Sequence, residues 1–169
     1  MATITLEDNP YNNDVQVLRD GLSAYNVARV PQLLTQPRGD VAIIARGDNK
    51  QVIGGAIGEY DWGWLYIDTL WVDDDHRLHG LGAQLLNAIE QYAYAQGIYH
   101  SYLMTTSFQA RPFYEKRGYA YIGQNENRPR GHTMYYLQKA LTQQGDANPS
   151  FEVQSPPNAN TLQFIDAQF

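Results

Sequence analysis

Alternation of apolar and polar positions predicts strands at several places along the chain. Residues 2–6 (ATITL) alternate over a short stretch, and residues 41–72 contain three apolar runs. Turn-forming residues separate these three runs at positions 48–49 (DN) and 61–63 (DWG), so we expect an antiparallel meander. The remaining predicted strands are 99–106, 119–123 and 132–141.

Apolar residues that recur every three or four positions predict three helices. The stripe Leu81, Leu85 and Ile89 predicts a helix over residues 81–96, and Gly97 is suited to end it. The other two predicted helices are 12–30 and 108–118. The resulting order, β-α-β-β-β-α-β-α-β-β, indicates one mixed α/β domain of the α+β type over residues 1–141.

Residues 142–169 differ in composition from the rest of the chain. They contain three acidic residues and neither Lys nor Arg. We expect them to form a C-terminal tail that is either a loosely ordered terminus or a segment docked on the body or on a second subunit.

Composition and charge narrow the class of protein. The 169 residues suit a single domain with a proper core, and the absence of cysteine excludes thiolate metal sites and cysteine nucleophiles. The start of the chain lacks the pattern of a signal peptide, and no apolar run is long enough to span a membrane, so a cytoplasmic protein is expected. The formal net charge of −6 argues against a nucleic-acid partner and favours cationic or neutral small molecules.

Gly80 and Gly82 lie where a predicted strand has ended and a helix is about to begin. A helix start has unpaired main-chain N–H groups, and glycine lets a phosphate approach them closely. Arg77 adds a positive charge nearby. The segment therefore indicates either a pyrophosphate cradle or an ordinary turn. His76 and His79 are three residues apart without a carboxylate at metal spacing, so we expect no metal here.

Two segments carry a resemblance to a known family. LWVDDDHRLHGLGAQLL resembles the acetyl-CoA signature of the GNAT superfamily of N-acetyltransferases, with Arg77, Gly80 and Gly82 in its fixed places. SFQARPFYEKRGYAYIG is similar to the family's second signature, which is filled here by Ala110, Phe113, Tyr114, Gly118 and Tyr119. The resemblance covers residues 3–141. It implies a GNAT-like fold, with a central, mostly antiparallel sheet, a splayed parallel strand pair and flanking helices.

The resemblance also implies roles for particular residues. Acetyl-CoA would be the co-substrate. The backbone of the splayed strand, Leu70, Trp71 and Val72, would bind its pantetheine arm. Ser107 stands where the family often has Asn beside that arm. Tyr114 falls where relatives place a tyrosine that protonates the departing thiolate. The pyrophosphate would be held at Arg77, Leu78, His79, Gly80, Leu81, Gly82 and Ala83.

Two acidic residues within apolar strands are candidates for the general base. An alkylamine is protonated at neutral pH, so a carboxylate or a water that it holds must remove a proton before attack. Asp68 interrupts LYIDTLWV, and alternation would place it on one face with Tyr66, Leu70 and Val72. Glu59 lies near the end of the neighbouring strand. A structural carboxylate is the alternative for each. An aromatic wall for a cationic substrate could be built from Trp62, Trp64, Trp71, Tyr25 and Tyr60.

The sequence thus predicts an enzyme that moves an acetyl group from acetyl-CoA to a primary amine of a small molecule in one ternary complex. Two alternatives stay open. The acceptor could be the amine of a protein or an aminoacyl-tRNA, or the chain could be a non-catalytic acyl-CoA-binding module. Relatives of such a family are often dimers, which makes a homodimer a further expectation.

Overall fold

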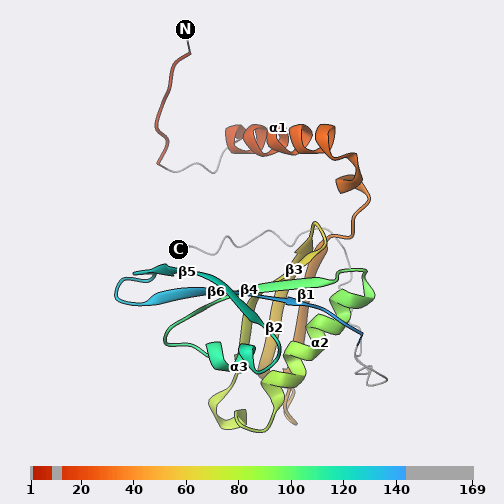
Figure 1. The fold of residues 1–169 in the computed structure, drawn as a ribbon, viewed down its shortest axis with the longest axis vertical. Helices are drawn as coiled ribbons and strands as arrows, with labels where there is room; N and C mark the ends of the chain where they lie inside the picture. The colour runs from red at the N-terminus through yellow and green to blue at the C-terminus, as the bar shows by residue number, and fades with distance from the viewer. Residues whose placement is uncertain (1, 9–12, 144–169) are drawn as a thin grey trace.

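The structure is a computed structural model that describes residues 2–8 and 13–143. Its centre is a six-stranded mixed sheet with the strand order β1-β2-β3-β4-β6-β5 (Figure 1). All neighbouring strands are antiparallel except β3 and β4, which run parallel. The strands are β1 (Gly39–Arg46), β2 (Val52–Asp61), β3 (Trp64–Val72), β4 (His100–Thr106), β5 (Ala120–Glu126) and β6 (Thr133–Ala140). The expected mixed α/β fold is confirmed.

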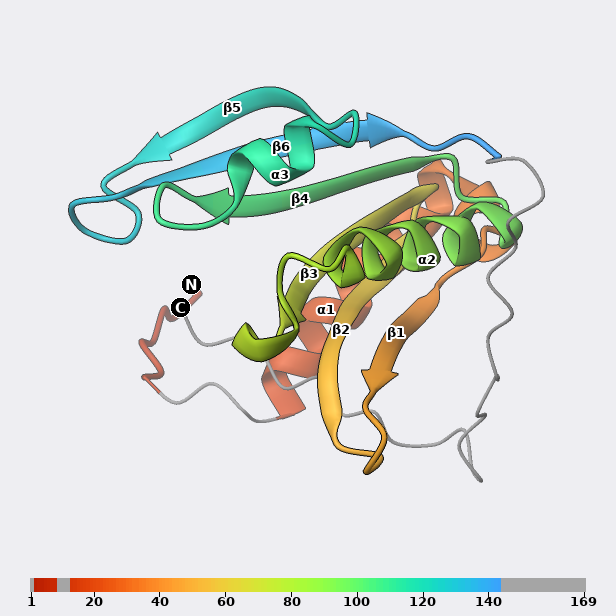
Figure 2. The same cartoon turned by 90° about the horizontal axis from the view of Figure 1, so that it is seen from below.

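Helix α2 (Leu81–Ala95) covers one face of β1, β2 and β3 (Figure 2). Its apolar stripe supplies Leu85, Leu86 and Ile89 to the core, which explains why the spacing of three and four residues predicted this helix closely. Glycines in β2 let the helix approach, because a Cβ at Gly54 would lie 3.2 Å from the Leu85 side chain. A Cβ at Gly58 would lie 3.3 Å from the Ile89 side chain of the same helix and would clash with the Tyr66 carbonyl oxygen.

A β-bulge in β3 changes which side chains face the helix. Gly58 pairs with Ile67 and Ile57 pairs with Thr69, so Asp68 is an extra residue between them. Leu65 and Ile67 face α2 before the bulge, and Leu70 and Val72 pack on the same core after it. The prediction that Asp68 shares a face with Leu70 and Val72 is therefore wrong, because the extra residue reverses the alternation.

The parallel pairing of β3 with β4 is short. It runs from Trp64 with His100 to Ile67 with Leu103, and beyond this point the two strands diverge (Figure 2). The separation begins next to the bulge at Asp68. The expected splayed pair is therefore present, and its open end leads toward the loop that precedes α2.

The N-terminal part differs from the expectation. Residues 2–6 form no strand, and Ile4 and Leu6 are 95% and 90% exposed. Alternation alone cannot make a strand when no sheet edge pairs with the segment. Helix α1 (Asn13–Arg29) forms as predicted but has no buried residue, and Figure 1 shows it beyond the end of the sheet.

Short elements complete the description. A 3-10 turn, η1 (Pro31–Leu34), follows α1, and a second one, η2 (Asp74–His76), follows β3. Helix α3 (Arg111–Glu115) is shorter than the predicted 108–118. Nearly all of the predicted tail, 144–169, lies outside the described residues, so the domain boundary near residue 141 stays a prediction. Among the described helices, none has the length and apolar character needed to cross a membrane.

Candidate active site

The loop from β3 to α2 presents free main-chain donors. Within residues 13–143, the N–H groups of residues 78–82 donate to no protein acceptor. The first N–H of α2 with a partner is that of Ala83, which donates to the Gly80 carbonyl at 3.0 Å. These donors lie at the positive end of the α2 macrodipole, which attracts an anion. We call residues 78–83 the cradle.

Backbone geometry explains the glycine at position 80. Gly80 precedes α2 with φ at 83°, a left-handed conformation that costs other residues about 1–2 kcal/mol. Leu78 has φ at 68° and its side chain is fully exposed, so it carries this strain without a packing benefit. An αL residue on either side of His79 bends the chain sharply into the helix.

Arg77 is bound to its own loop. Its Nε–H donates to the Val72 carbonyl at 3.0 Å, and its Nη2 lies 2.7 Å from an Asp74 carboxylate oxygen. His76 contacts Asp73 in the same turn, with 3.3 Å between Nδ1 and Oδ1. Arg77 thus fixes the end of β3 relative to the loop. In the described part of the chain, no group of three or more His, Asp or Glu side chains is placed to hold a metal ion.

Helix α3 packs directly against the cradle. A Cβ at Gly82 would lie 3.5 Å from two atoms of the Phe113 ring and 3.7 Å from Val72 Cγ2. The ring of the next residue, Tyr114, packs edge-on against those of Phe113 and Tyr119. Burial raises the pKa of the Tyr114 phenol. The Tyr114 phenol is therefore protonated at neutral pH, as a general acid requires.

Ser107 lies at the end of β4 on the other side of the split. Its hydroxyl accepts the Thr133 N–H at 3.3 Å and lies 3.3 Å from His132 Nδ1. Its own N–H donates to the Thr133 carbonyl at 2.8 Å. These bonds tie the end of β4 to the start of β6, so the predicted contact between Ser107 and pantetheine competes with a structural role.

Both candidate bases lie on the sheet face opposite α2. Glu59 pairs in register with Tyr66, and Tyr66 pairs with Tyr102 in β4. The rings of Tyr66 and Tyr102 stack with centroids 4.9 Å apart. Burial, followed by the negative charge of Asp68, raises the pKa of Tyr66 to about 12, and Glu59 contributes. Asp68 and Glu59 are exposed and form no ion pair within the described ranges.

The predicted aromatic wall is only partly present. Trp64 stacks on His100 with centroids 4.7 Å apart and meets Tyr102 edge-on, so it belongs to the face that holds Glu59. Tyr60 instead lies in the core against Tyr92 of α2. Tyr25 lies on α1 beneath the Arg29 guanidinium, away from these rings. Trp64, Tyr66 and Tyr102, together with Glu59 and Asp68, form what we call the acceptor face.

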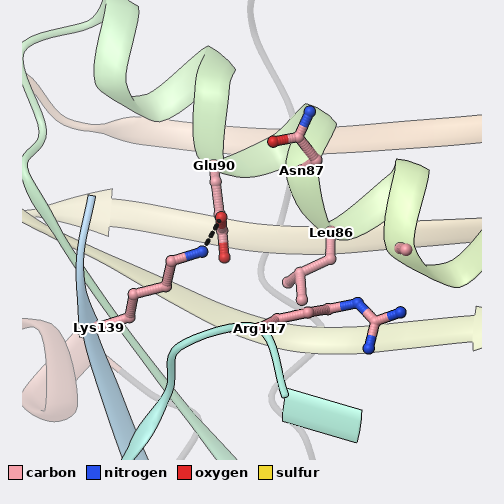
Figure 3. Close-up of a pocket in the computed structure, with 6 residues that line it drawn as sticks. Leu86, Asn87, Glu90, Arg117 and Lys139 are labelled. Carbon is pink, nitrogen blue, oxygen red and sulfur yellow. Dashed lines mark hydrogen bonds and ion pairs between the residues drawn. The ribbon is translucent and has the colours of Figure 1, made fainter. Parts of the chain in front are cut away.

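A cavity of about 290 Å³ adjoins the cradle on the helix side (Figure 3). Glu90 is buried here and receives hydrogen bonds from Lys139 Nζ at 2.6 Å and from the Tyr119 hydroxyl at 2.9 Å. Tyr119 also lies 2.9 Å from the Ser101 hydroxyl. The cavity is lined by Ala83, Leu86, Asn87, Glu90, Arg117 and Lys139.

Sequence reasoning missed this cavity and the stacked tyrosines. One signal for the cavity was available, because Glu90 interrupts the apolar stripe of α2 at a core-facing position. A carboxylate at such a position needs a partner. The Tyr66–Tyr102 pair could not be found in this way, since it depends on the register between two strands that are far apart in the sequence.

The parallel strands β3 and β4 separate beside α2, whose N-terminal N–H groups are free. This arrangement defines the class of acyl-CoA-dependent acetyltransferases. The family model described as "Acetyltransferase (GNAT) family" matches residues 9–119. The chain belongs to this family of acetyltransferases.

Three known proteins show the range of similarity. The chain is 35% identical to blasticidin-S acetyltransferase of Streptomyces morookaense over 114 residues, 67% of this chain and 84% of that protein. The crystal structure of an acetyltransferase from Bacillus cereus ATCC 14579 matches with a TM-score of 0.74 and 31% identity, covering 81% and 98% of the two chains. A PaiA N-acetyltransferase of Thermoplasma acidophilum, solved with coenzyme A, shares the fold at 15% identity, with a TM-score of 0.54 and coverage of 60% and 61%.

Proposed function

We propose that this acetyltransferase moves the acetyl group of acetyl-CoA to a primary amine of a small molecule in a single ternary complex. The observation that carries the proposal is the set of free N–H groups at residues 78–82, next to the open split between β3 and β4. A diphosphate fits such donors, and an extended arm fits between strands that no longer pair. Acetyl-CoA has both parts, and it supplies the activated acetyl thioester.

Different residues beside the split bind different parts of acetyl-CoA. The free N–H groups of residues 78–82 hold the diphosphate, and Arg77 keeps their loop in place through Val72 and Asp74. The backbone of Leu70, Trp71 and Val72 makes no strand bond to β4, since β3 pairs with β4 only as far as Ile67, and the Val72 carbonyl accepts a hydrogen bond from Arg77 instead. N–H groups near Trp71 and Val72 stabilise the negative charge that develops on the carbonyl oxygen.

The chemical step needs one base and one acid. The acceptor arrives as an ammonium ion, and Asp68, Glu59 or a water held by them removes its proton. The amine nitrogen then forms a bond to the carbonyl carbon, the carbon–sulfur bond breaks, and the sulfur takes a proton from Tyr114. Tyr114 suits the last role because its raised pKa keeps the phenol protonated at neutral pH.

The acceptor face supports a small cationic amine as substrate. Glu59 and Asp68 have no cationic partner among the described residues, and half-buried aromatic rings lie beside them. Carboxylates and ring faces both attract ammonium groups. The substrate named for the Streptomyces relative, blasticidin S, is a small molecule, which favours this class over a protein or aminoacyl-tRNA amine.

A thiol-release assay tests the proposal. Purified protein with acetyl-CoA is offered small diamines, amino sugars, aminonucleosides, lysine-containing peptides and charged tRNA. We expect saturable thiol release with small amines and N-acetylated products by mass spectrometry. Thiol release only with peptides or with charged tRNA would mean that the acceptor is a macromolecule. Binding of coenzyme A without release for any amine would favour a binding module.

A further inference from the structure

A buried polar cluster lies between α2 and the sheet, and the proposed chemical step does not use it. Its members are Glu90 on α2, Ser101 on β4, Tyr119 just before β5 and Lys139 on β6. The Glu90 side chain is 3% exposed and pairs with Lys139, with 2.6 Å between Oε2 and Nζ (Figure 3). A buried charge pair is costly and depends on good geometry, so it holds its hydrogen-bond partners in a defined position.

The Tyr119 side chain is the partner that this cluster fixes. Its hydroxyl donates to Glu90 Oε1 at 2.9 Å and lies 2.9 Å from the Ser101 hydroxyl. A phenol has a single proton, so the Ser101 hydroxyl donates to Tyr119 when that proton is given to Glu90. Burial raises the pKa of Tyr119, so the phenol stays protonated, as this arrangement requires. Tyr119 is therefore anchored from two sides.

Tyr119 in turn contacts Tyr114 through both its backbone and its ring. Its N–H donates to the Tyr114 carbonyl at 3.2 Å, and the two rings meet edge-on with centroids 5.9 Å apart. Within the described residues, the Tyr114 hydroxyl has no hydrogen-bond partner. Helix α3, which carries Tyr114, has five residues, and so short a helix is not stable alone. The orientation of the Tyr114 phenol therefore depends on the rings beside it, those of Phe113 and Tyr119.

We infer that Tyr119 is a positioning residue for acetyl transfer, and that its buried anchor aims the Tyr114 phenol at the departing sulfur. The inference rests on the proposed function, which makes Tyr114 the acid. Tyr119 touches no reacting atom in this role. It keeps the Tyr114 hydroxyl within hydrogen-bond reach of the thiolate, and even a small displacement of a catalytic group is costly in rate.

Tyr119→Phe tests the inference, because it keeps the ring and removes the anchoring hydroxyl. We expect kcat to fall by roughly 10-fold while the KM for acetyl-CoA stays within about twofold, since the phenol acts only as the thiolate leaves. Glu90 stays paired with Lys139 in this variant. Tyr60→Phe is the matched control. It removes the hydroxyl of another buried tyrosine, which packs against Tyr92, and should leave kcat unchanged.

A double-mutant cycle with Tyr114→Phe separates positioning from a general structural role. Without the Tyr114 phenol there is no acid to aim, so adding Tyr119→Phe to Tyr114→Phe should lower kcat by less than about twofold. An equal loss in both backgrounds, or an unchanged kcat in Tyr119→Phe alone, would overturn the inference. If circular dichroism shows that Tyr119→Phe does not fold, Ser101→Ala takes its place in the same cycle, with an expected loss of roughly 2- to 5-fold.

The same cycle distinguishes this inference from the proposed function. A slow Tyr114→Phe enzyme in which Tyr119→Phe still has its full effect would leave Tyr114 as the acid and remove only the positioning role. A wild-type kcat in Tyr114→Phe would remove the proposed acid itself, and the positioning role with it.

Discussion

The Phe113 ring lies against the backbone of Gly82, so closely that an added Cβ would sit 3.5 Å from two ring atoms. This contact joins α3 to the first turn of α2. It also places the next residue, Tyr114, relative to the cradle, because the two rings meet edge-on with centroids 5.1 Å apart. The proposed diphosphate site and the proposed acid are therefore parts of one packed unit.

Gly80→Glu should remove the binding of coenzyme A. The new carboxylate would stand among the donors of the cradle, and repulsion of a few kcal/mol at about 4 Å corresponds to roughly a 100-fold loss of affinity. Calorimetry measures this loss. The matched control is Gly97→Glu, since Gly97 has φ at 84° and nothing within 4 Å of an added Cβ, but lies at the far end of α2. Similar affinity in both variants would exclude the cradle as the diphosphate site.

Tyr114→Phe should lower kcat by about 100-fold and leave the KM for acetyl-CoA within about twofold, because the phenol acts only as the thiolate leaves. Steady-state thiol release measures both constants. Tyr99→Phe alters an exposed tyrosine beyond the C-terminal end of α2 and should leave kcat unchanged. A wild-type kcat in Tyr114→Phe would mean that another group or water protonates the sulfur.

Asp68→Asn should slow the reaction most at neutral pH. Asp68 lies at the bulge where the strands separate, so we assign the base to it and substrate binding to Glu59. An amine with a pKa near 10 loses its proton without a base as the pH rises. The rate of Asp68→Asn should therefore be about 100-fold below that of the wild type at pH 7, and the difference should shrink toward pH 10. Rate profiles over this range measure the effect.

Glu59→Gln is the companion variant. We expect it to raise the KM for the amine, because it removes a negative charge that attracts the cation. The pH profile should change little, because Glu59 is not the proposed proton acceptor. A profile like that of Asp68→Asn would exchange the two roles. Wild-type profiles in both variants would assign the proton to a water held elsewhere.

Tyr66 should make the protein less stable at alkaline pH. Its pKa rises to about 12 in the fold, against about 10 in the unfolded chain. The unfolded state therefore releases the proton first, and the free energy of unfolding should fall between pH 10 and 12. Urea titrations at several pH values measure this slope. Tyr66→Phe should show a shallower decline, and a slope equal to that of the wild type would contradict the assignment.

Local patterns predicted the parts of the fold that depend on local spacing. Helix 81–96 is observed at Leu81–Ala95, and the three strands of the meander lie where the turns at 48–49 and 61–63 separate them. The two signatures also identified the family, and the structure shows that the loop and the short helix that carry them touch through Gly82 and Phe113.

Features that depend on partners could not be predicted in the same way. Nothing in LYIDTLWV marks Asp68 as a bulge, since the extra residue is defined by its pairing with β2. Residues 2–6 have the alternation of a strand but no edge to pair with. Helix α1 has an apolar spacing, yet its Leu18 and Leu22 stay exposed. The homodimer and the tail after residue 141 stay predictions.

The bulge at Asp68 separates two tasks within one strand. Before it, β3 carries the aromatic rings of the acceptor face on the side away from α2; after it, the same strand turns Leu70 and Val72 into the core beneath the helix. If the proposed roles hold, a change of amine can alter Trp64 and Tyr66 without disturbing the proposed coenzyme A site. One inserted residue thus lets the proposed donor site and the proposed acceptor site vary independently within a single strand.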